Sequence, residues 1–374
     1  MNKFTPHFYL YFFLLTISSL SFAQEELKLK DVFKNDFLIG AAINDAQING
    51  RDSVGIEILK TQFNSISPEN VLKWSSIQPK PDTYNFEPAD KYVEFGEKNH
   101  MFIIGHTLVW HSQVPRWVFN DENGNQLNRD ELLKRMKEHI FTVVGRYKGK
   151  IKGWDVVNEA LNEDGTLRET LWRKIIGDDY IEKAFEFAHE ADPDAELYYN
   201  DYSLANKPKR DGAVKLISKL LKEGIKVDGI GMQGHYHLDW PTTAKIDSSI
   251  KAFSALGVKV MFTELDINIL PSPQQNNTAE VSLNFRYDKK LNPYTDGLPD
   301  SVENVLAQRY ADIFEVFINN KNSISRVTFW GVRDSDSWLN FWPIRGRTNY
   351  PLLFNRDGKP KKAFYKIISL INKN

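Results

Sequence analysis

The stretch Gly153–Leu161, with the sequence GWDVVNEAL, contains a short bulky run that ends on an amide and a carboxylate. Its residues 154–157 are largely apolar or β-branched, which is typical of a buried strand. Polar groups at the end of a buried run need partners or solvent, so we expect Asn158 and Glu159 at the rim of a sheet. The stretch therefore predicts a strand whose carboxyl end presents a carboxylate.

A second carboxylate, Glu264, ends a similar run over Val258–Glu264. Two glutamates at the carboxyl ends of two strands, far apart in the sequence, suggest a pair of carboxylates that acts in catalysis. Each glutamate alone is equally well explained as a salt-bridged strand end or as a neighbour of a helix N-cap, because structural ion pairs also use carboxylates. The residues that accompany Glu159 and Glu264 decide between these interpretations.

Predicted strands alternate with segments of helical spacing along the chain. We expect strands at 37–42, 63–67, 101–107, 154–157, 196–200, 229–233, 258–264 and 324–330, and helices at 51–61, 87–99, 129–147, 170–191, 208–223, 244–255, 302–320 and 361–372. Eight strand–helix repeats specify an α/β fold of the (β/α)8 TIM barrel type better than an open sheet. A chain of 374 residues fits one such barrel, so we expect a single catalytic domain over residues 24–374.

The N-terminus has the pattern of a secretory signal peptide. Lys3 provides a positive charge, Phe8–Leu20 is almost wholly apolar or hydroxylic, and Ser21 and Ala23 are small enough for a signal peptidase. We expect cleavage near Ala23, which would remove residues 1–23 and secrete the protein to the periplasm or the extracellular space. A membrane anchor is the alternative, but the apolar run is shorter than the roughly 20 residues that a span requires.

The composition argues against several classes of function. The 48 Lys and Arg residues balance 49 Asp and Glu residues without a basic run, so neither a nucleic acid nor a membrane surface is expected as a partner. The chain contains no cysteine, which excludes disulfides, thiol nucleophiles and Cys-ligated zinc. Its nine Trp residues are easier to explain if some of them contact a ligand with apolar faces.

Polar and aromatic side chains follow the predicted strands, where barrels of this type carry their chemistry. They lie at 69–74, 106–111, 158–159, 200–202, 233–235, 264–266 and Trp330. These segments supply amides, imidazoles, indoles and carboxylates, but no glycine-rich phosphate loop and no Lys/Arg cluster. Such a cleft suits a sugar. Cleavage of a glycosidic bond needs one carboxylic acid and one carboxylate, which Glu159 and Glu264 can supply.

A metal site is the main rival interpretation. Extended backbone at His235 and His237 would put two imidazoles on one face, and His106 and Asp266 could complete a ligand set like those of metal-dependent barrel hydrolases. We rank this interpretation second and expect no metal. Structural roles are expected for His111, His237, Trp117 and Trp154.

Four motifs together resemble the family 10 glycoside hydrolases, which are endo-β-1,4-xylanases. They are GHTLVWH, WDVVNEAL, FTELDI and TFWGVRDSDSWL, and the resemblance extends from about Asp36 to Ile371. It implies a (β/α)8 barrel that hydrolyses internal bonds of xylan or xylo-oligosaccharides by a retaining double displacement. On this basis Glu159 is the acid/base and Glu264 is the nucleophile.

The same resemblance implies which residues bind the substrate. Asn158 matches a contact to the sugar 2-hydroxyl, and Asp266 is expected to orient His235. Tyr202 is assigned to the leaving-group side. The other expected sugar-binding residues are Glu69, Asn70, Lys73, His106, Trp110, Gln113, Gln233, His235, Trp330 and Trp338. No cofactor is implied, and we expect a monomer.

One segment departs from the family pattern. After Asp266 the chain continues through a long polar loop at about 271–300. Loops of this length are usually functional or mobile. This loop follows the nucleophile strand, so it either covers the cleft and alters sugar binding or packs as a solvated decoration on the side of the barrel.

Two other functions stay open at this point. The first is another retaining barrel glycosidase, such as a β-glucanase or a mannanase. The second is a glycan-binding protein without activity, although the presence of both glutamates argues against it. The sequence leaves open the number of sugar subsites, the tolerance of decorated xylans and any activity on β-glucans.

Overall fold

The computed structural model describes residues 27–272 and 279–371, together with Met1. Its strands are parallel and follow the order β6-β5-β4-β3-β2-β1-β9-β8, and a further pairing between β6 and β8 closes the sheet into a barrel. The predicted (β/α)8 TIM barrel is therefore confirmed. The strands are β1 (Leu38–Ile43), β2 (Ser65–Pro68), β3 (Phe102–Trp110), β4 (Gly153–Asn158), β5 (Glu196–Asp201), β6 (Gly229–Met232), β7 (His235–His237), β8 (Lys259–Asn268) and β9 (Ile324–Phe329).

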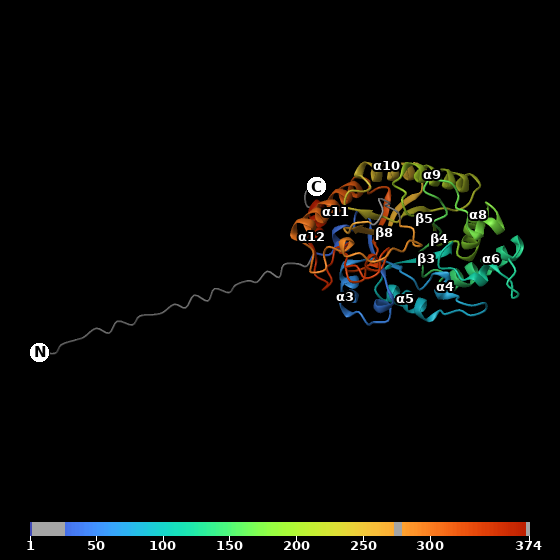
Figure 1. Cartoon of the computed structure of the whole chain (residues 1–374), viewed down its shortest axis with the longest axis horizontal. Helices are drawn as coiled ribbons and strands as arrows, with labels where there is room; N and C mark the ends of the chain where they lie inside the picture. Colours follow the sequence, from blue (N-terminus) through green and yellow to red (C-terminus); the bar gives the residue numbers. More distant parts are fainter. Residues whose placement is uncertain (2–26, 273–278, 372–374) are drawn as a thin grey trace.

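Helices surround the strands on all sides (Figure 1). They are α1 (Leu29–Val32), α2 (Asp45–Ile48), α3 (Ser53–Gln62), α4 (Trp74–Ile77), α5 (Glu87–Lys98), α6 (Arg129–Arg146), α7 (Leu171–Ile176), α8 (Tyr180–Ala191), α9 (Lys207–Lys222), α10 (Thr243–Ser254), α11 (Asp300–Asn319) and α12 (Lys362–Ile371), with 3-10 turns η1 (Arg116–Phe119), η2 (Lys289–Leu291) and η3 (Trp338–Asn340). Because helices cover the outer face and side chains fill the interior, parallel strands are buried on both faces. The run Gly153–Asn158 is accordingly buried at every position.

The packing between β3 and β4 depends on one glycine. Trp154 is fully buried, as expected for a core residue, and its indole lies over Gly105 of the neighbouring strand. Any side chain at Gly105 would overlap the indole ring. The two positions therefore form a large–small pair, which is how adjacent strands can both be buried at high packing density.

The structure corrects three details of the predicted elements. The helix expected at 170–191 is two helices, α7 and α8, because Gly177 between them has a φ of 112°. A short extra strand, β7, follows Gly234 and pairs with the outer end of β8. Glu264 does not end its strand: β8 continues to Asn268, although its pairing with β6 stops at Phe262.

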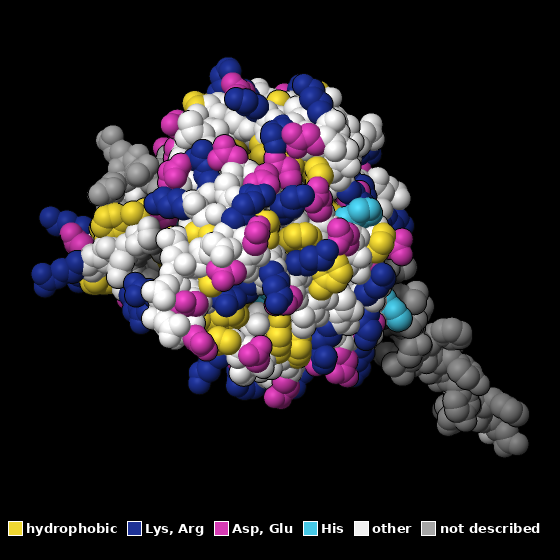
Figure 2. Space-filling view, turned by 90° about the vertical axis from the view of Figure 1, so that its right-hand side faces the viewer, with side chains coloured by type: hydrophobic (Ala, Val, Ile, Leu, Met, Phe, Trp, Pro, Cys, Tyr) yellow, Lys and Arg dark blue, Asp and Glu magenta, His cyan; other side chains and the backbone are white. Residues whose placement is uncertain are grey.

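Charges of both signs are interspersed on the face of the molecule shown in Figure 2, as the balanced composition predicts. Among the residues that the structure describes, no helix is long and apolar enough to cross a membrane. The expected signal peptide lies at residues 1–23, and positions 2–26 are outside the described residues. Secretion after cleavage near Ala23 therefore stays a prediction.

The contact between Trp154 and Gly105 predicts a strong asymmetry between two glycine substitutions. Gly105→Ala should destabilise the fold by about 1–3 kcal/mol, because the new methyl group overpacks a rigid buried indole. Gly145→Ala is the control, since Gly145 lies near the exposed end of α6 with open space around it. It should be neutral or stabilising by about 0.5–1 kcal/mol. Urea unfolding of the two variants measures both effects, and equal stabilities would contradict this account.

Candidate active site

A cleft opens where the barrel strands end, and the predicted residues meet there. Its lining is formed by Glu69, Asn70, Lys73, His106, Trp110, Gln113, Asn158, Glu159, Gln233, His235, Glu264, Ala279, Val281, Trp330 and Trp338. Of the residues assigned to catalysis or sugar binding, Tyr202 alone does not line this cleft. Ala279 and Val281, which belong to the long loop, were not assigned a role from the sequence.

Glu159 follows β4 directly and is held at the rim by its backbone. Its N–H donates to the Asn200 carbonyl over 2.9 Å, and its φ of 57° is unusual for a residue with a side chain. The carboxylate accepts hydrogen bonds from Trp110 Nε1 at 2.8 Å and from Gln233 Nε2 at 2.9 Å. Burial raises the pKa of Glu159 to about 7, and the nearby charge of Asp201 adds to this shift against the two hydrogen bonds. Glu159 is therefore suited to hold a proton near neutral pH.

Glu264 lies in β8 at the point where the barrel pairing becomes irregular, between Phe262 and Leu265. It accepts hydrogen bonds from Asn200 Nδ2 at 2.9 Å and from His235 Nε2 at 3.2 Å. Burial alone would raise the pKa of this carboxyl, but the hydrogen bond from His235, the charges of His106 and His235 and the hydrogen bond from Asn200 together outweigh it and lower the pKa. Glu264 is therefore ionised where Glu159 is protonated.

His235 connects Glu264 to Asp266, as expected for a residue that Asp266 orients. Its Nδ1 lies 3.0 Å from Asp266 Oδ1, while Nε2 faces Glu264. Burial would lower the pKa of the imidazole, but Asp266 and Glu264 raise it to about 10. At neutral pH both ring nitrogens then carry protons, so His235 is a cation that donates to two carboxylates.

Asp266 also fixes one of the two aromatic walls. Its Oδ2 accepts a hydrogen bond from Trp338 Nε1 at 2.7 Å. The Trp338 ring stacks on Trp342 with 4.4 Å between centroids, and it lies 4.8 Å from the His235 ring. The other wall, Trp330, stands edge-on to His235 with a centroid distance of 6.3 Å. One carboxylate thus positions both the cation beside Glu264 and an aromatic wall.

The group around Lys73 forms another part of the lining. Lys73 Nζ lies 3.1 Å from the side-chain oxygen of Asn70 and 5.2 Å from the centre of the Trp110 ring. Burial lowers the pKa of Lys73 and raises that of Glu69, while the attraction between the two groups opposes both shifts. An amine, an amide and a carboxyl therefore line one part of the cleft, where hydroxyl groups of a sugar can bind.

Two buried partners of the site were not identified from the sequence. Asn200 is fully buried in β5, where its amide lies 2.9 Å from the Asn158 amide and donates to Glu264. Asp155 lies in β4, before the rim residue Asn158, and its Oδ2 is 2.9 Å from His106 Nδ1. The sequence places Asn200 at a strand end but gives no sign of its contacts, and Asp155 looks like an ordinary strand residue.

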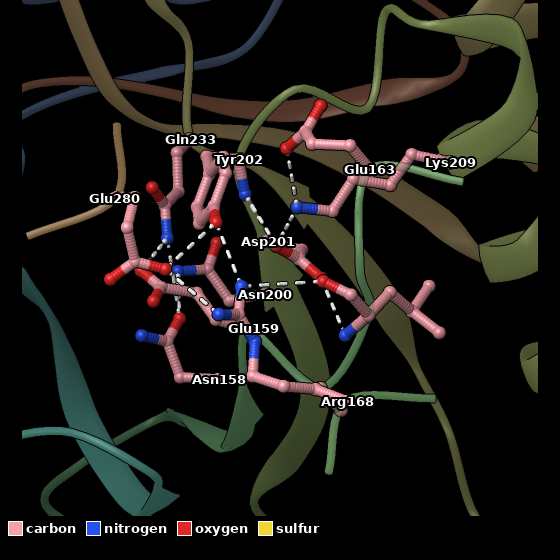
Figure 3. Close-up of polar contacts among 12 residues, drawn as sticks. Asn158, Glu159, Glu163, Arg168, Asn200, Asp201, Tyr202, Lys209, Gln233 and Glu280 are labelled. Carbon is pink, nitrogen blue, oxygen red and sulfur yellow. Dashed lines mark hydrogen bonds and ion pairs between the residues drawn. The ribbon is translucent and has the colours of Figure 1, made fainter. Parts of the chain in front are cut away.

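A polar network supports the Glu159 side of the site (Figure 3). Asp201 forms an ion pair of 2.9 Å with the fully buried Lys209, and it accepts a hydrogen bond of 2.5 Å from Tyr199. Tyr202 lies behind the cleft, where its hydroxyl accepts from Arg168 Nη2 at 2.7 Å and donates to Glu280 at 3.4 Å. Its hydroxyl is thus engaged by Arg168 and Glu280, and its assignment to the leaving-group side stays a prediction.

The long loop divides into parts with different environments. Residues 273–278, which include the triplet Asn276–Thr278, lie outside the described residues. Ala279 and Val281 line the cleft, which favours the first of the two interpretations of the loop. Further along, Phe285 N–H donates to the Pro343 carbonyl over 2.8 Å.

Within the described residues, no group of three or more His, Cys, Asp or Glu side chains is arranged to hold a metal ion.

A (β/α)8 barrel with an acid and an ionised carboxylate in one sugar-compatible cleft defines a glycoside hydrolase. A model of one family, described as Glycosyl hydrolase family 10, matches residues 28–370. The chain belongs to this family.

Proteins named as xylanases are similar to this chain over almost its whole length. It is 46% identical over 370 residues to the endo-1,4-beta-xylanase A of Xylanibacter ruminicola, covering 99% of this chain and 100% of that protein. A GH10 endoxylanase from a sugarcane soil metagenome has a similar solved structure, with a TM-score of 0.89 at 45% identity over 91% of this chain and 99% of that one. Another similar structure, solved in complex with xylotriose, has a TM-score of 0.82 at 36% identity over 91% of this chain and 99% of that one.

The opposite pKa shifts of Glu159 and Glu264 predict the pH dependence of activity. Because Glu159 must be protonated to act as an acid, kcat/KM should fall as the pH rises through about 7. Trp110→Phe removes a hydrogen bond that favours the ionised form of Glu159, so the alkaline limb should move to higher pH. A pH profile of kcat/KM measures this shift. An alkaline limb that stays in place, or moves to lower pH, would show that it reports another group.

Proposed function

We propose that, in this family 10 endo-1,4-β-xylanase, Glu159 is the acid/base and Glu264 is the nucleophile of a retaining double displacement. The observation that carries the assignment is the difference between the two carboxyls: burial keeps Glu159 protonated near neutral pH, whereas His235 keeps Glu264 ionised. The family membership and the names of the relatives support xylan as the substrate.

In the first step, a Glu264 carboxylate oxygen attacks the anomeric carbon while Glu159 gives its proton to the leaving glycosidic oxygen. The C–O bond to the leaving sugar breaks, and a glycosyl ester forms on Glu264. Retaining enzymes hold the two carboxyls about 5–5.5 Å apart for this purpose. Trp110 and Gln233 hydrogen bond to the two oxygens of Glu159 and stabilise its carboxylate form after the proton has left.

In the second step, the ionised Glu159 takes a proton from water, and the water oxygen attacks the anomeric carbon. The ester bond breaks and Glu264 leaves as a carboxylate, so the product keeps the β configuration. The negative charge of Glu264 is one of the causes that raise the pKa of Glu159, and glycosylation has removed that charge. The ester therefore makes Glu159 a better carboxylate at the stage where it must act as a base.

Exclusion at the aromatic walls explains a preference for xylose. Xylose lacks the hydroxymethyl group that glucose carries on C5, so a rigid wall close to C5 accepts the first sugar and clashes with the second. Trp338 is rigid because Asp266 holds its Nε1 and Trp342 stacks on its ring. A wall that cannot relax discriminates more strongly than a pocket that merely misses one contact. That the active enzyme is a monomer stays a proposal.

The roles of the two glutamates are tested by removing each carboxyl. Glu264→Ala should abolish turnover of all glycosides, since no covalent intermediate can form. Glu159→Ala should lower the rate of the first step by roughly 10²–10⁴-fold for substrates with poor leaving groups. The rate should fall much less for aryl xylobiosides whose leaving group needs little protonation. Rates measured over a series of aryl xylobiosides separate these cases. Equal losses for good and poor leaving groups in Glu159→Ala would overturn the assignment.

The role of the wall is tested with aryl xylobiosides and aryl cellobiosides. The unmodified enzyme should prefer xylobiosides in kcat/KM, and Trp338→Ala should narrow that preference by weakening turnover of xylobiosides more. Trp117→Ala is the control, because this half-buried Trp stacks with Arg135 and does not line the cleft. If Trp338→Ala lowers both activities by the same factor, the preference for xylobiosides arises elsewhere. Glu69, Asn70 and Lys73 are then the first residues to test.

A further inference from the structure

The segment Ala279–Val281 reaches the catalytic cleft from the long loop after β8. Ala279 and Val281 line the same cleft as Glu159 and Glu264. Glu280 between them does not line it; its carboxylate pairs with Arg168 Nη1 at 2.8 Å. Both charged side chains are about four-fifths buried, since 19% of Arg168 and 22% of Glu280 is exposed. Two apolar side chains therefore face the cleft while an ion pair holds the residue between them.

Arg168 is in turn fixed to the turn that carries Glu159. Its backbone N–H donates to the Ala160 carbonyl over 2.8 Å, and its Nη2 lies 3.4 Å from the Leu161 carbonyl. Nη2 also donates to the Tyr202 hydroxyl, which itself contacts Glu280 (Figure 3). The ion pair thus joins the loop after β8 to the two residues that follow the acid/base.

The contacts of this ion pair indicate on which side of the cleft it lies. Glu159 gives its proton to the oxygen of the leaving sugar, so the leaving sugar lies on the Glu159 side of the reacting bond. The group formed by Arg168, Tyr202 and Glu280 is attached to the backbone next to Glu159, whereas Trp338 and Asp266 lie beside Glu264 and His235. Ala279 and Val281 are therefore held toward the leaving-group side.

We propose that Ala279–Val281 forms a wall of the site for the leaving-group sugar, and that the ion pair between Glu280 and Arg168 holds this wall in place. The inference rests on the proposed function, because it assumes that Glu159 protonates the leaving group. The ligand is a β-1,4-linked xylose unit on the leaving side of the cleaved bond. Ala279 and Val281 offer it methyl groups, so the contact is with the C–H face of the sugar rather than with its hydroxyl groups.

If the ion pair is lost and the wall loosens, the effect on hydrolysis should depend on the leaving group of the substrate. Xylopentaose has a sugar as leaving group and uses the wall, whereas an aryl xylobioside has an aromatic leaving group and binds its sugars on the Glu264 side. Loss of the ion pair should therefore weaken only the first reaction. Glu280 and Arg168 act through the position of Ala279 and Val281, so they are positioning residues.

The test compares Glu280→Ala with Glu169→Ala as a matched control. Glu169 is the neighbour of Arg168 in the chain and pairs with Arg173, but its side chain is 63% exposed. Glu280→Ala should lower kcat/KM for xylopentaose by about tenfold, the size of effect expected when a few apolar contacts are lost. It should change kcat/KM for 4-nitrophenyl β-xylobioside by less than twofold. Glu169→Ala should leave both values within twofold.

Val281→Ala provides an independent check, because it trims the wall and leaves the ion pair intact. It should reproduce the loss that is selective for xylopentaose. Equal losses for both substrates in Glu280→Ala would overturn the proposal, since they would mean that the ion pair acts on Glu159 or on the fold. Unchanged activity on both would overturn it as well. An unmodified enzyme that hydrolyses neither substrate would instead contradict the proposed function.

Discussion

The hydrogen bond between His235 and Glu264 is the interaction on which the site depends. Burial by itself tends to raise the pKa of Glu159 and of Glu264, so two equally buried glutamates without other partners would both tend to be protonated. A buried imidazolium beside one of them breaks this symmetry. In the described part of the chain, the hydrogen bonds to the Glu159 carboxylate come from neutral donors, Trp110 and Gln233. Glu159 therefore keeps its proton while Glu264 keeps its charge.

The barrel makes this arrangement possible because parallel strands deliver their carboxyl ends to one rim. Glu159 follows β4, His235 begins β7 and Glu264 lies in β8, so three distant parts of the sequence meet at the rim. Asp266 stabilises the cation and holds Trp338 at the same time. The protonation of Glu264 and the shape of the cleft are thus linked through one carboxylate.

The sequence was sufficient to predict whatever depends on local pattern. Strands, surrounding helices and the rim position of Glu159 follow from runs of apolar residues that end on polar ones. Contacts between buried side chains leave no such pattern. Asp155 looks like an ordinary strand residue, and Asn200 is expected only at a strand end, until the fold brings them to His106 and Glu264.

Loops and irregular elements were the other limit of prediction. The helical spacing of 170–191 continues across Gly177, although the backbone there cannot stay helical with a φ of 112°. The strand period of Val258–Glu264 gives no reason for β8 to continue to Asn268, which happens because β7 supplies a new partner. The place of Ala279 and Val281 in the cleft depends on an ion pair to Arg168, more than a hundred residues earlier in the chain.

The most direct test of the account is the titration of Glu159 and Glu264 by NMR in protein labelled with 13C at the glutamate carboxyls. Glu159 should titrate near pH 7, and Glu264 should titrate below the ordinary value of 4.5. When a 2-fluoro xylobioside has glycosylated Glu264, the pKa of Glu159 should fall. A Glu159 that titrates at its ordinary value in the free enzyme, and does not respond to the glycosyl ester, would contradict the claim that the two carboxyls have opposite protonation states and that Glu159 loses and regains a proton during the reaction.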